Sequence, residues 1–170
     1  MRRSKKKEIE IFCRKILSLL KRRKQTLSIA ESCTGGYVSK LITDIPGASK
    51  VFKGSIISYA DDIKVKILKV RERDLKTYGA VSCEIVKQMV CNVRKILDTD
   101  WGIAITGIAG PKGGTKTKPV GTVWIAVSGP DNVKTLRFRF QGDREYIRYS
   151  AVKEAIRFLY REICAIRAEF

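Results

Sequence analysis

The 170-residue sequence contains no histidine. A Ser-His-Asp triad, a Cys-His pair and an HExxH zinc site are therefore all excluded. If the protein is a hydrolase, its general base must be a lysine, an aspartate, a glutamate or a tyrosine.

Cysteine is sparse, and long hydrophobic runs are absent. The five cysteines are odd in number and form no CxxC pair: Cys13, Cys33, Cys83, Cys91 and Cys164. This pattern argues against a disulfide framework or a zinc site and favours a reducing compartment. The longest uncharged stretches, such as residues 119–130, fall short of the ~18 apolar residues that a membrane span needs. No signal-peptide core follows the basic N-terminus. We expect a cytoplasmic protein without membrane contact, metal or cofactor.

Positive charge is abundant, because 35 Lys and Arg against 17 Asp and Glu give a net charge of +18. Half of that excess lies in residues 1–24, which hold 11 basic and two acidic residues. Apolar side chains recur in the same stretch at helical spacing: Ile9, Phe12, Cys13, Ile16, Leu17, Leu19 and Leu20. This periodicity favours an amphipathic helix packed on the core. A nucleic-acid-binding arm is the alternative, and the basic surface would also suit small phosphorylated substrates.

Strand and helix patterns alternate along the chain. The expected strands are 26–31, 53–59, 101–106, 120–128 and 133–140, and the expected helices are 5–24, 34–43, 61–69, 82–98 and 143–167. Ser82 is the expected N-cap of its helix. Residues 129–132 have the composition of a hairpin turn. Strands separated by helices predict an α/β sandwich with a mainly parallel sheet, and the hairpin makes that sheet mixed. With no internal repeat or linker, residues 1–170 are expected to form one domain.

The segment Ala30–Gly36 (AESCTGG) lies where a strand is expected to turn into a helix. Its small residues allow a sharp turn and close approach of a ligand. The first N–H groups of the helix would suit a phosphate or an oxyanion, although a plain strand–helix turn fits as well. Cys33 could be activated at a helix N-terminus, but without histidine we favour a packing role for it.

Ser49, Tyr59 and Lys64 flank one expected strand. Ligands of α/β sheets gather at the carboxyl ends of strands, and Tyr59 and Lys64 lie at such an end. In a chain without histidine, a lysine held in its uncharged form is the natural base for a serine hydroxyl. A helix-surface Lys64 and a packed Tyr59 are the structural alternative.

Two further segments indicate ligand binding. The Gly-rich loop (residues 107–119) follows a buried strand, does not match a Walker A sequence, and has a length typical of functional loops. Asp143 is a suitable cap for the last helix, and Arg144 after it could bind a phosphate or lie on the surface.

Taken together, these segments resemble the C-terminal domain family of CinA, the nicotinamide-nucleotide amidohydrolases also called PncC. The resemblance covers about residues 5–165. It rests on AESCTGG at 30–36, PGAS at 46–49, YADDIK at 59–64, GAVS at 79–82, TGIAGPKGG at 106–114, KPVGTV at 118–123 and GDR at 142–144. It implies a three-layer α/β/α sandwich with a mixed, mainly parallel sheet.

The resemblance also implies an activity, which is hydrolysis of the carboxamide of nicotinamide mononucleotide to nicotinate mononucleotide and ammonia, in pyridine nucleotide recycling. The implied catalytic positions are Ser32, Ser49, Tyr59, Lys64 and Thr106. The implied substrate-binding positions are Thr34, Gly35, Gly36, Gly107, Gly110, Gly113 and Arg144. No metal or cofactor is implied, and enzymes of this class and size often form homodimers.

A Ser–Lys pair suits this chemistry, because uncharged Lys64 can take the proton of a serine that attacks the amide. We favour Ser49 slightly as the nucleophile and give Ser32 a positioning or oxyanion role, with the reverse assignment open. Lys64 or Tyr59 would help ammonia leave. Arg144 and the Gly-rich loop would hold the 5′-phosphate.

This chain departs from the family pattern at Lys112, where an Asp is usual, and at Asp61, where an Asn is usual. Neither change touches the proposed Ser, Lys, Thr or Arg positions. The alternative function is that of a competence- or DNA-damage-related accessory protein that binds nucleic acid through its basic surface.

Overall fold

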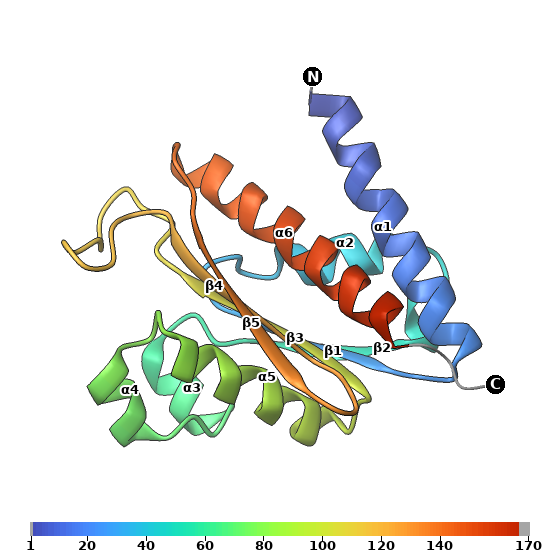
Figure 1. Ribbon diagram of the computed structural model, residues 1–170, viewed down its shortest axis with the longest axis horizontal. Coiled ribbons are helices and arrows are strands. Elements are labelled where there is room, and N and C mark those ends of the chain that lie inside the picture. Colours follow the sequence, from blue (N-terminus) through green and yellow to red (C-terminus); the bar gives the residue numbers. More distant parts are fainter. Residues whose placement is uncertain (1, 167–170) are drawn as a thin grey trace.

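The computed structural model describes residues 2–166, and its five strands form one sheet with helices on both faces (Figure 1). The strands are β1 (Leu27–Glu31), β2 (Phe52–Ile57), β3 (Trp101–Gly107), β4 (Thr122–Ser128) and β5 (Val133–Arg139). The helices are α1 (Arg2–Arg22), α2 (Tyr37–Thr43), α3 (Asp61–Lys66), α4 (Glu72–Tyr78), α5 (Cys83–Leu97) and α6 (Arg144–Ala165), with a 3-10 turn η1 (Ala48–Lys50). Residues 1 and 167–170, which the predicted domain includes, lie outside this range.

The strand order is β2-β1-β3-β4-β5. β1 pairs in parallel with both β2 and β3, whereas β4 is antiparallel to both β3 and β5. The predicted mixed sheet is therefore confirmed, and β4 is the one strand of the five that points the other way. β1, β2 and β3 all finish at the same end of the sheet, which we call the carboxyl edge.

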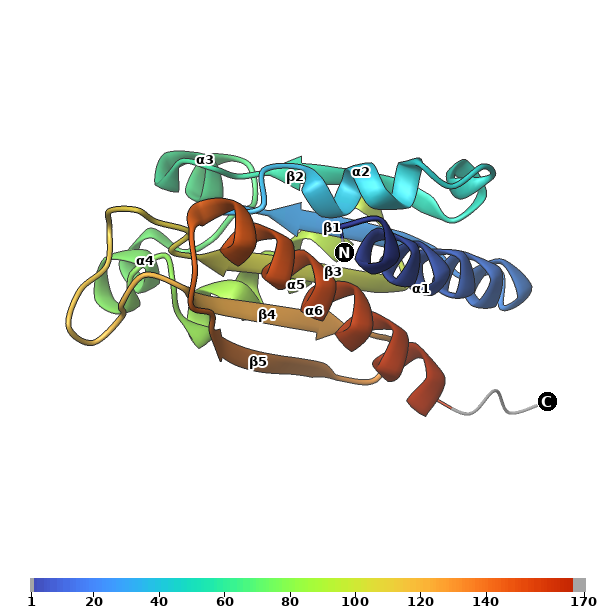
Figure 2. The same cartoon turned by 90° about the horizontal axis from the view of Figure 1, so that it is seen from above.

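Three layers are evident in the two cartoon views, as the resemblance implied. α1, α2 and α6 cover one face and α3, α4 and α5 lie against the other (Figures 1 and 2). Successive residues of a strand point to opposite faces, and Ala30, Ala104 and Ala126 stand directly beside one another across β1, β3 and β4. This row of small side chains packs with the buried residues of α5 and lets the helix lie close to the sheet.

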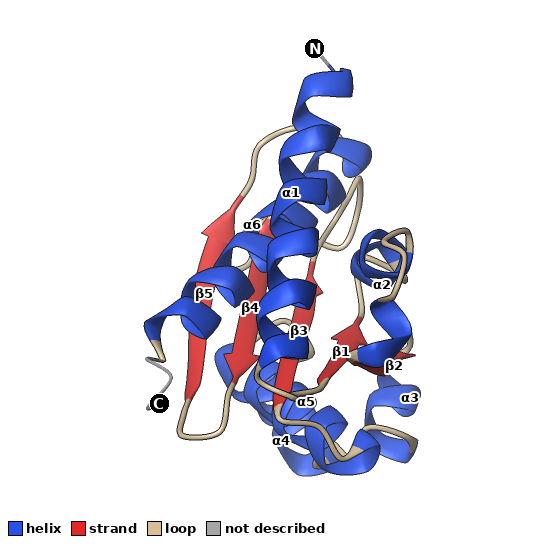
Figure 3. Cartoon of the chain, turned by 90° about the vertical axis from the view of Figure 1, so that its right-hand side faces the viewer, coloured by secondary structure: helices blue, strands red, loops and turns tan. Residues whose placement is uncertain are grey.

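α1 confirms the predicted amphipathic helix. Ile9, Cys13 and Ile16 are buried in the core shared with α6, whereas Arg14 and Lys15 are exposed. Figure 3 shows α1 running beside α6 over the sheet. The basic residues described here thus occupy the solvated face of a packed helix.

α4 was not predicted from the sequence, because its buried residue is an acid and not an apolar side chain. Asp74 accepts hydrogen bonds from Gln88 Nε2 at 2.9 Å and pairs with Arg71 Nε at 2.8 Å. Tertiary hydrogen bonds therefore hold this short helix. Within residues 2–166, no helix combines the length and the apolar character needed to cross a membrane.

The entry into β4 requires a glycine. Gly121 has φ +90°, and a Cβ added there would lie 1.9 Å from the carbonyl oxygen of Phe140. Gly121 also accepts the amide of Phe140 at 2.9 Å. The glycine of the KPVGTV segment thus allows the chain before α6 to pass against the start of β4.

Candidate active site

The turn between β1 and α2, residues 32–36, is built around the buried carboxylate of Glu31, which has no exposed surface. Its Oε2 accepts from the amides of Gly36 and Val38 at 3.0 and 3.2 Å. Its Oε1 accepts from Ser39 N at 2.9 Å and Ser39 Oγ at 2.6 Å. A negative charge at this position also suits the helix dipole.

Glu31 therefore occupies the anion site that the sequence assigned to a ligand. The expectation that the first amides of α2, including that of Gly36, bind a phosphate or an oxyanion is wrong, because these donors are already used. Two amides earlier in the turn are not used in this way. Those of Cys33 and Thr34 donate to no other residue within 2–166.

Lys64 lies inside the molecule at the carboxyl edge, not on a helix surface, and its side chain is 1% exposed. Its Nζ donates to the carbonyl of Ser58 at 3.0 Å and to Asp61 Oδ1 at 3.1 Å. Ser58 in turn donates its amide to the carbonyl of Glu31 at 2.8 Å. The lysine is thus held where β1 and β2 end and is linked through Ser58 to Glu31, the residue that precedes Ser32.

Ser32 and Ser49 lie at opposite ends of the sheet. Ser32 follows β1, is nearly buried, and donates its amide to the carbonyl of Ile105 at 3.0 Å. Ser49 lies in η1, exposed, before β2 begins. Six residues of β2 separate it from the carboxyl edge, a span of about 20 Å at ~3.3 Å per residue. The predicted pairing of Ser49 with Lys64 is therefore wrong within one chain, and the reverse assignment, Ser32 with Lys64, fits the geometry.

Thr106 is the last but one residue of β3 and is buried. Its Oγ1 donates to the carbonyl of Ala80 at 2.9 Å, which ties the GAVS segment to the edge. At the next position, Gly107, an added Cβ would lie 2.7 Å from Val123 and 3.1 Å from the sulfur of Cys33. This glycine allows β3 and the turn after β1 to approach one another.

Arg144 joins three distant segments at the mouth of the site. Its Nη1 donates to the carbonyl of Gly110 at 2.7 Å and its Nη2 to the hydroxyl of Tyr59 at 2.6 Å. Tyr59 is 58% exposed, so its ring faces solvent and is not packed. Asp143 caps α6 as expected, accepting from Tyr146 N at 2.7 Å. The remaining predicted binding residue of the loop, Gly113, is exposed, and an added Cβ there would lie 3.7 Å from Ile108.

Sequence reasoning missed Arg148, which reaches the same turn from α6. Its Nη2 donates to the carbonyl of Thr34 at 2.7 Å. A Cβ at Gly35 would lie 3.4 Å from this nitrogen, so the guanidinium lies against the turn. Its spacing of one helical turn from Arg144 was the available signal, because residues four apart share a helix face.

Cys33 is a packed thiol and not an activated one. Burial raises the pKa of the Cys33 thiol to about 12, and the charges of Arg148 and Lys64 only partly oppose this effect. The sequence expectation of a packing role agrees with this environment. Both cations lie near enough to the turn for their charges to act on this sulfur.

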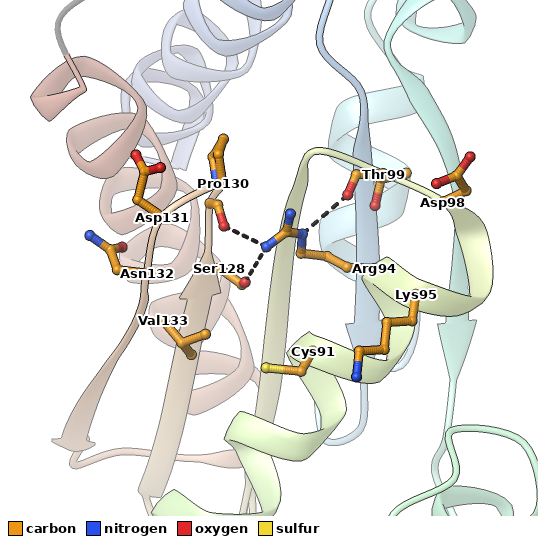
Figure 4. Close-up of a pocket in the computed structure, with 11 residues that line it drawn as sticks. Cys91, Arg94, Lys95, Asp98, Thr99, Ser128, Pro130, Asp131, Asn132 and Val133 are labelled. Atoms are coloured by element: carbon orange, nitrogen blue, oxygen red, sulfur yellow. Dashed lines mark hydrogen bonds between the residues drawn. The ribbon is translucent and has the colours of Figure 1, made fainter.

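A hollow of about 400 Å³ lies at the opposite end of the sheet, between the end of α5 and the β4–β5 turn (Figure 4). Arg94 projects into it and donates to the carbonyls of Thr99 and Gly129 and to Ser128 Oγ. This guanidinium is engaged in holding the hairpin. A second hollow of about 480 Å³ adjoins the GAVS segment and the end of the Gly-rich loop, with Lys118, Trp124 and Arg137 in its lining.

A family model described as the CinA C-terminal domain matches residues 10–163. The chain belongs to this family. The CinA-like protein of Endomicrobium trichonymphae is 46% identical over 147 residues, which cover 86% of this chain and 34% of that protein. The CinA-like protein of Thermotoga maritima is 48% identical over 141 residues, which cover 83% and 34%. This CinA domain thus spans about a third of the length of these curated relatives.

Solved structures share the fold of this CinA domain. The competence damage-inducible protein A of Klebsiella pneumoniae has a TM-score of 0.90 at 29% identity, covering 94% of this chain and 99% of that one. The competence/damage inducible protein of Agrobacterium tumefaciens has a TM-score of 0.88 at 35% identity, covering 90% and 94%. The resemblance found in the sequence and the three-layer fold it implied are both confirmed.

Proposed function

We propose that this CinA domain hydrolyses the carboxamide of nicotinamide mononucleotide to nicotinate mononucleotide and ammonia. The observation that carries the proposal is the position of Lys64. Its amine is buried at the carboxyl edge on the carbonyl of Ser58, whose amide bonds the carbonyl of Glu31, so the amine lies at the same edge as Ser32. A serine beside a buried lysine is a nucleophile and base pair that works without histidine.

In this proposal Ser32 Oγ attacks the carboxamide carbon while the amine of Lys64 acts as the general base and takes the hydroxyl proton. The amides of Cys33 and Thr34 then stabilise the oxyanion, since the amide after a nucleophile is a common oxyanion donor. The C–N bond breaks and the lysine returns its proton to the leaving nitrogen, which departs as ammonia. Water then hydrolyses the acyl-serine ester, with Lys64 as base, and releases nicotinate mononucleotide.

Tyr59, Thr106 and Arg144 have supporting roles in this scheme. Thr106 holds the GAVS segment against the edge through the carbonyl of Ala80. Arg144 uses two of its N–H directions on Gly110 and Tyr59, and its remaining donors are available for the 5′-phosphate. The Tyr59 hydroxyl accepts from Arg144 and so keeps its own proton to donate near the leaving group.

The test is to incubate the purified protein with nicotinamide mononucleotide and measure ammonia and nicotinate mononucleotide together. Ser32→Ala and Lys64→Ala should each lower kcat by at least ~10³, as removal of a nucleophile or its base does elsewhere. Ser49→Ala and Lys66→Ala are the matched controls and should retain activity, because Ser49 lies at the other edge and Lys66 is an exposed neighbour paired with Asp62. Full activity in Lys64→Ala would refute the mechanism, and absence of product with folded wild type would refute the function.

The homodimer, the cytoplasmic location and the nucleic-acid alternative stay predictions. Sedimentation of the purified protein measures the first. For the last, duplex DNA binding should appear at low salt and fall steeply as salt rises. The packing of α1 into the core makes its charge an ordinary solvated helix face, so the hydrolase is the function we favour.

A further inference from the structure

Arg148 holds the turn after β1 in a way that the family motifs did not suggest. It is half-buried and donates to the carbonyl of Thr34, 114 residues earlier in the chain. Within residues 2–166 it has no acidic partner. Its Nε is fully buried without a hydrogen-bond partner, and so is Oγ1 of Thr34 beside it.

Such an arrangement is costly for stability alone. A cation partly removed from water without a carboxylate partner loses solvation that a single carbonyl restores only in part. The carbonyl of Thr34 already accepts the amide of Tyr37 at 3.3 Å, so the guanidinium is not needed to satisfy it. Buried, incompletely satisfied polar groups are uncommon in native structures and gather where function requires them.

Several hydrogen bonds anchor the turn, and Arg148 donates one of them from a side-chain cation. Ser32 is fixed by its amide on the carbonyl of Ile105, and Gly36 by its amide on Glu31. Between them, the carbonyl of Ser32 accepts the amide of Gly35 at 3.0 Å. The carbonyl of Thr34 accepts the amide of Tyr37 at 3.3 Å and the shorter, charge-assisted bond of Arg148 at 2.7 Å. With both flanks and the centre held, the peptide groups that carry the Cys33 and Thr34 amides have little freedom to rotate.

We propose that Arg148 is a positioning residue that keeps the amides of Cys33 and Thr34 aimed at the carboxamide oxygen. It acts through the carbonyl of Thr34 and does not touch the substrate. This inference rests on the proposed function for its catalytic consequence. Its geometric part, the fixing of the turn, does not depend on that function.

The catalytic test compares Arg148→Ala and Arg148→Lys with Arg157→Ala. Arg157 is on the same helix and bonds Glu8 and Glu154, so its loss disturbs α6 without touching the turn. Arg148→Ala should lower kcat by about 100-fold with KM within about threefold, because misdirected oxyanion donors cost roughly that much. Arg148→Lys, which keeps one donor for the carbonyl, should recover part of the rate. Arg157→Ala should lower the melting temperature and leave kcat unchanged.

Two outcomes would overturn the proposal. A raised KM with unchanged kcat in Arg148→Ala would make Arg148 a substrate-binding residue. A fall in kcat no larger than that of Arg157→Ala would leave it a simple helix anchor.

A second measurement separates this proposal from the proposed function. In amide NMR spectra, Arg148→Ala and Arg148→Lys should shift the signals of Cys33 and Thr34, whereas Arg157→Ala should not. If wild type releases no ammonia but these shifts occur, the function fails and the positioning stands. If the amide signals of Cys33 and Thr34 do not shift in either Arg148 variant, the proposal that Arg148 positions these amides is refuted, whatever the activity.

Discussion

Replacing Glu31 by glutamine tests how strongly a buried carboxylate holds the turn after β1. The side chain accepts four hydrogen bonds, two on each oxygen. A glutamine has one oxygen and one NH2 group, so one pair of donors must face another donor. The less costly orientation turns the NH2 group of the glutamine toward Ser39. The Ser39 hydroxyl can then rotate to accept a hydrogen bond, but the backbone amide of Ser39 loses its acceptor.

The magnitude follows from these contacts. One buried amide left unpaired costs about 1–3 kcal/mol, and bonds to a charged acceptor are about 1 kcal/mol stronger than neutral ones. Loss of the charge at the start of α2 adds about 0.3–1 kcal/mol. We expect Glu31→Gln to lower the free energy of unfolding by about 3 kcal/mol. For a chain of this length that corresponds to a fall of roughly 6–12 °C in melting temperature.

The assay is reversible thermal unfolding followed by circular dichroism. Glu10→Gln is the matched control, because Glu10 is exposed and pairs with Arg14 on the surface of α1. An exposed ion pair of this kind contributes about 0.5 kcal/mol or less. If Glu31→Gln melts within about 2 °C of Glu10→Gln, the carboxylate does not hold the turn and the reasoning fails.

Three further predictions follow from the structure. Burial raises the pKa of the Cys13 and Cys33 thiols from 9.0 to about 12. Unfolding above pH 9 therefore releases thiol protons. The free energy of unfolding measured in urea should fall by about 1.4 kcal/mol per pH unit per cysteine up to pH 12. The double alanine variant should lack this slope, and a wild-type stability flat above pH 9 would contradict the prediction. Gly121→Ala should cost more than about 3 kcal/mol of unfolding free energy because its Cβ would meet Phe140 at 1.9 Å. In Gly113→Ala the added Cβ would have its nearest atom at 3.7 Å. This variant should lose only the ~1 kcal/mol of unfolding free energy that a side chain at positive φ costs. Equal losses in the two glycine variants would refute the contact with Phe140. Asp61→Asn replaces the carboxylate that accepts from Lys64 Nζ at 3.1 Å by an amide whose oxygen can still accept from that amine, so kcat should stay within about threefold of the wild type. A tenfold or larger fall in kcat would show that the carboxylate itself assists the reaction.

The fold was predictable where an element carries its own pattern. α1 and α5 have apolar residues at helical spacing, and Ser82 and Asp143 cap their helices through Ile85 and Tyr146 as their positions suggested. α4 had no such pattern, since Asp74 is satisfied by residues from outside the helix. An element stabilised by distant partners leaves no periodic trace in its own sequence.

The site was predictable in its residue types and less so in its pairing. Ser49 and Lys64 are close in sequence, and that proximity suggested a pair, although a whole strand lies between them. The sequence did not predict that the Glu31 carboxylate accepts the first amides of α2, because the direction in which a side chain at a strand end points is not encoded locally. The spacing of Arg148 from Arg144 placed both on one helix face, but the contact of Arg148 with Thr34 forms only through the tertiary fold.

The single reversed strand has a consequence for how this site can change. Because β4 starts where β3 ends, residues 108–121 connect two neighbouring points of the same edge. The connections from β1 to β2 and from β2 to β3 must instead travel the full length of the sheet. A connection between neighbouring antiparallel strands can be as short as about two residues, and doubling the length of a flexible loop costs only about 0.6 kcal/mol. Insertions or deletions there can reshape the rim of the site without disturbing a strand, so new specificities are most readily built at this connection.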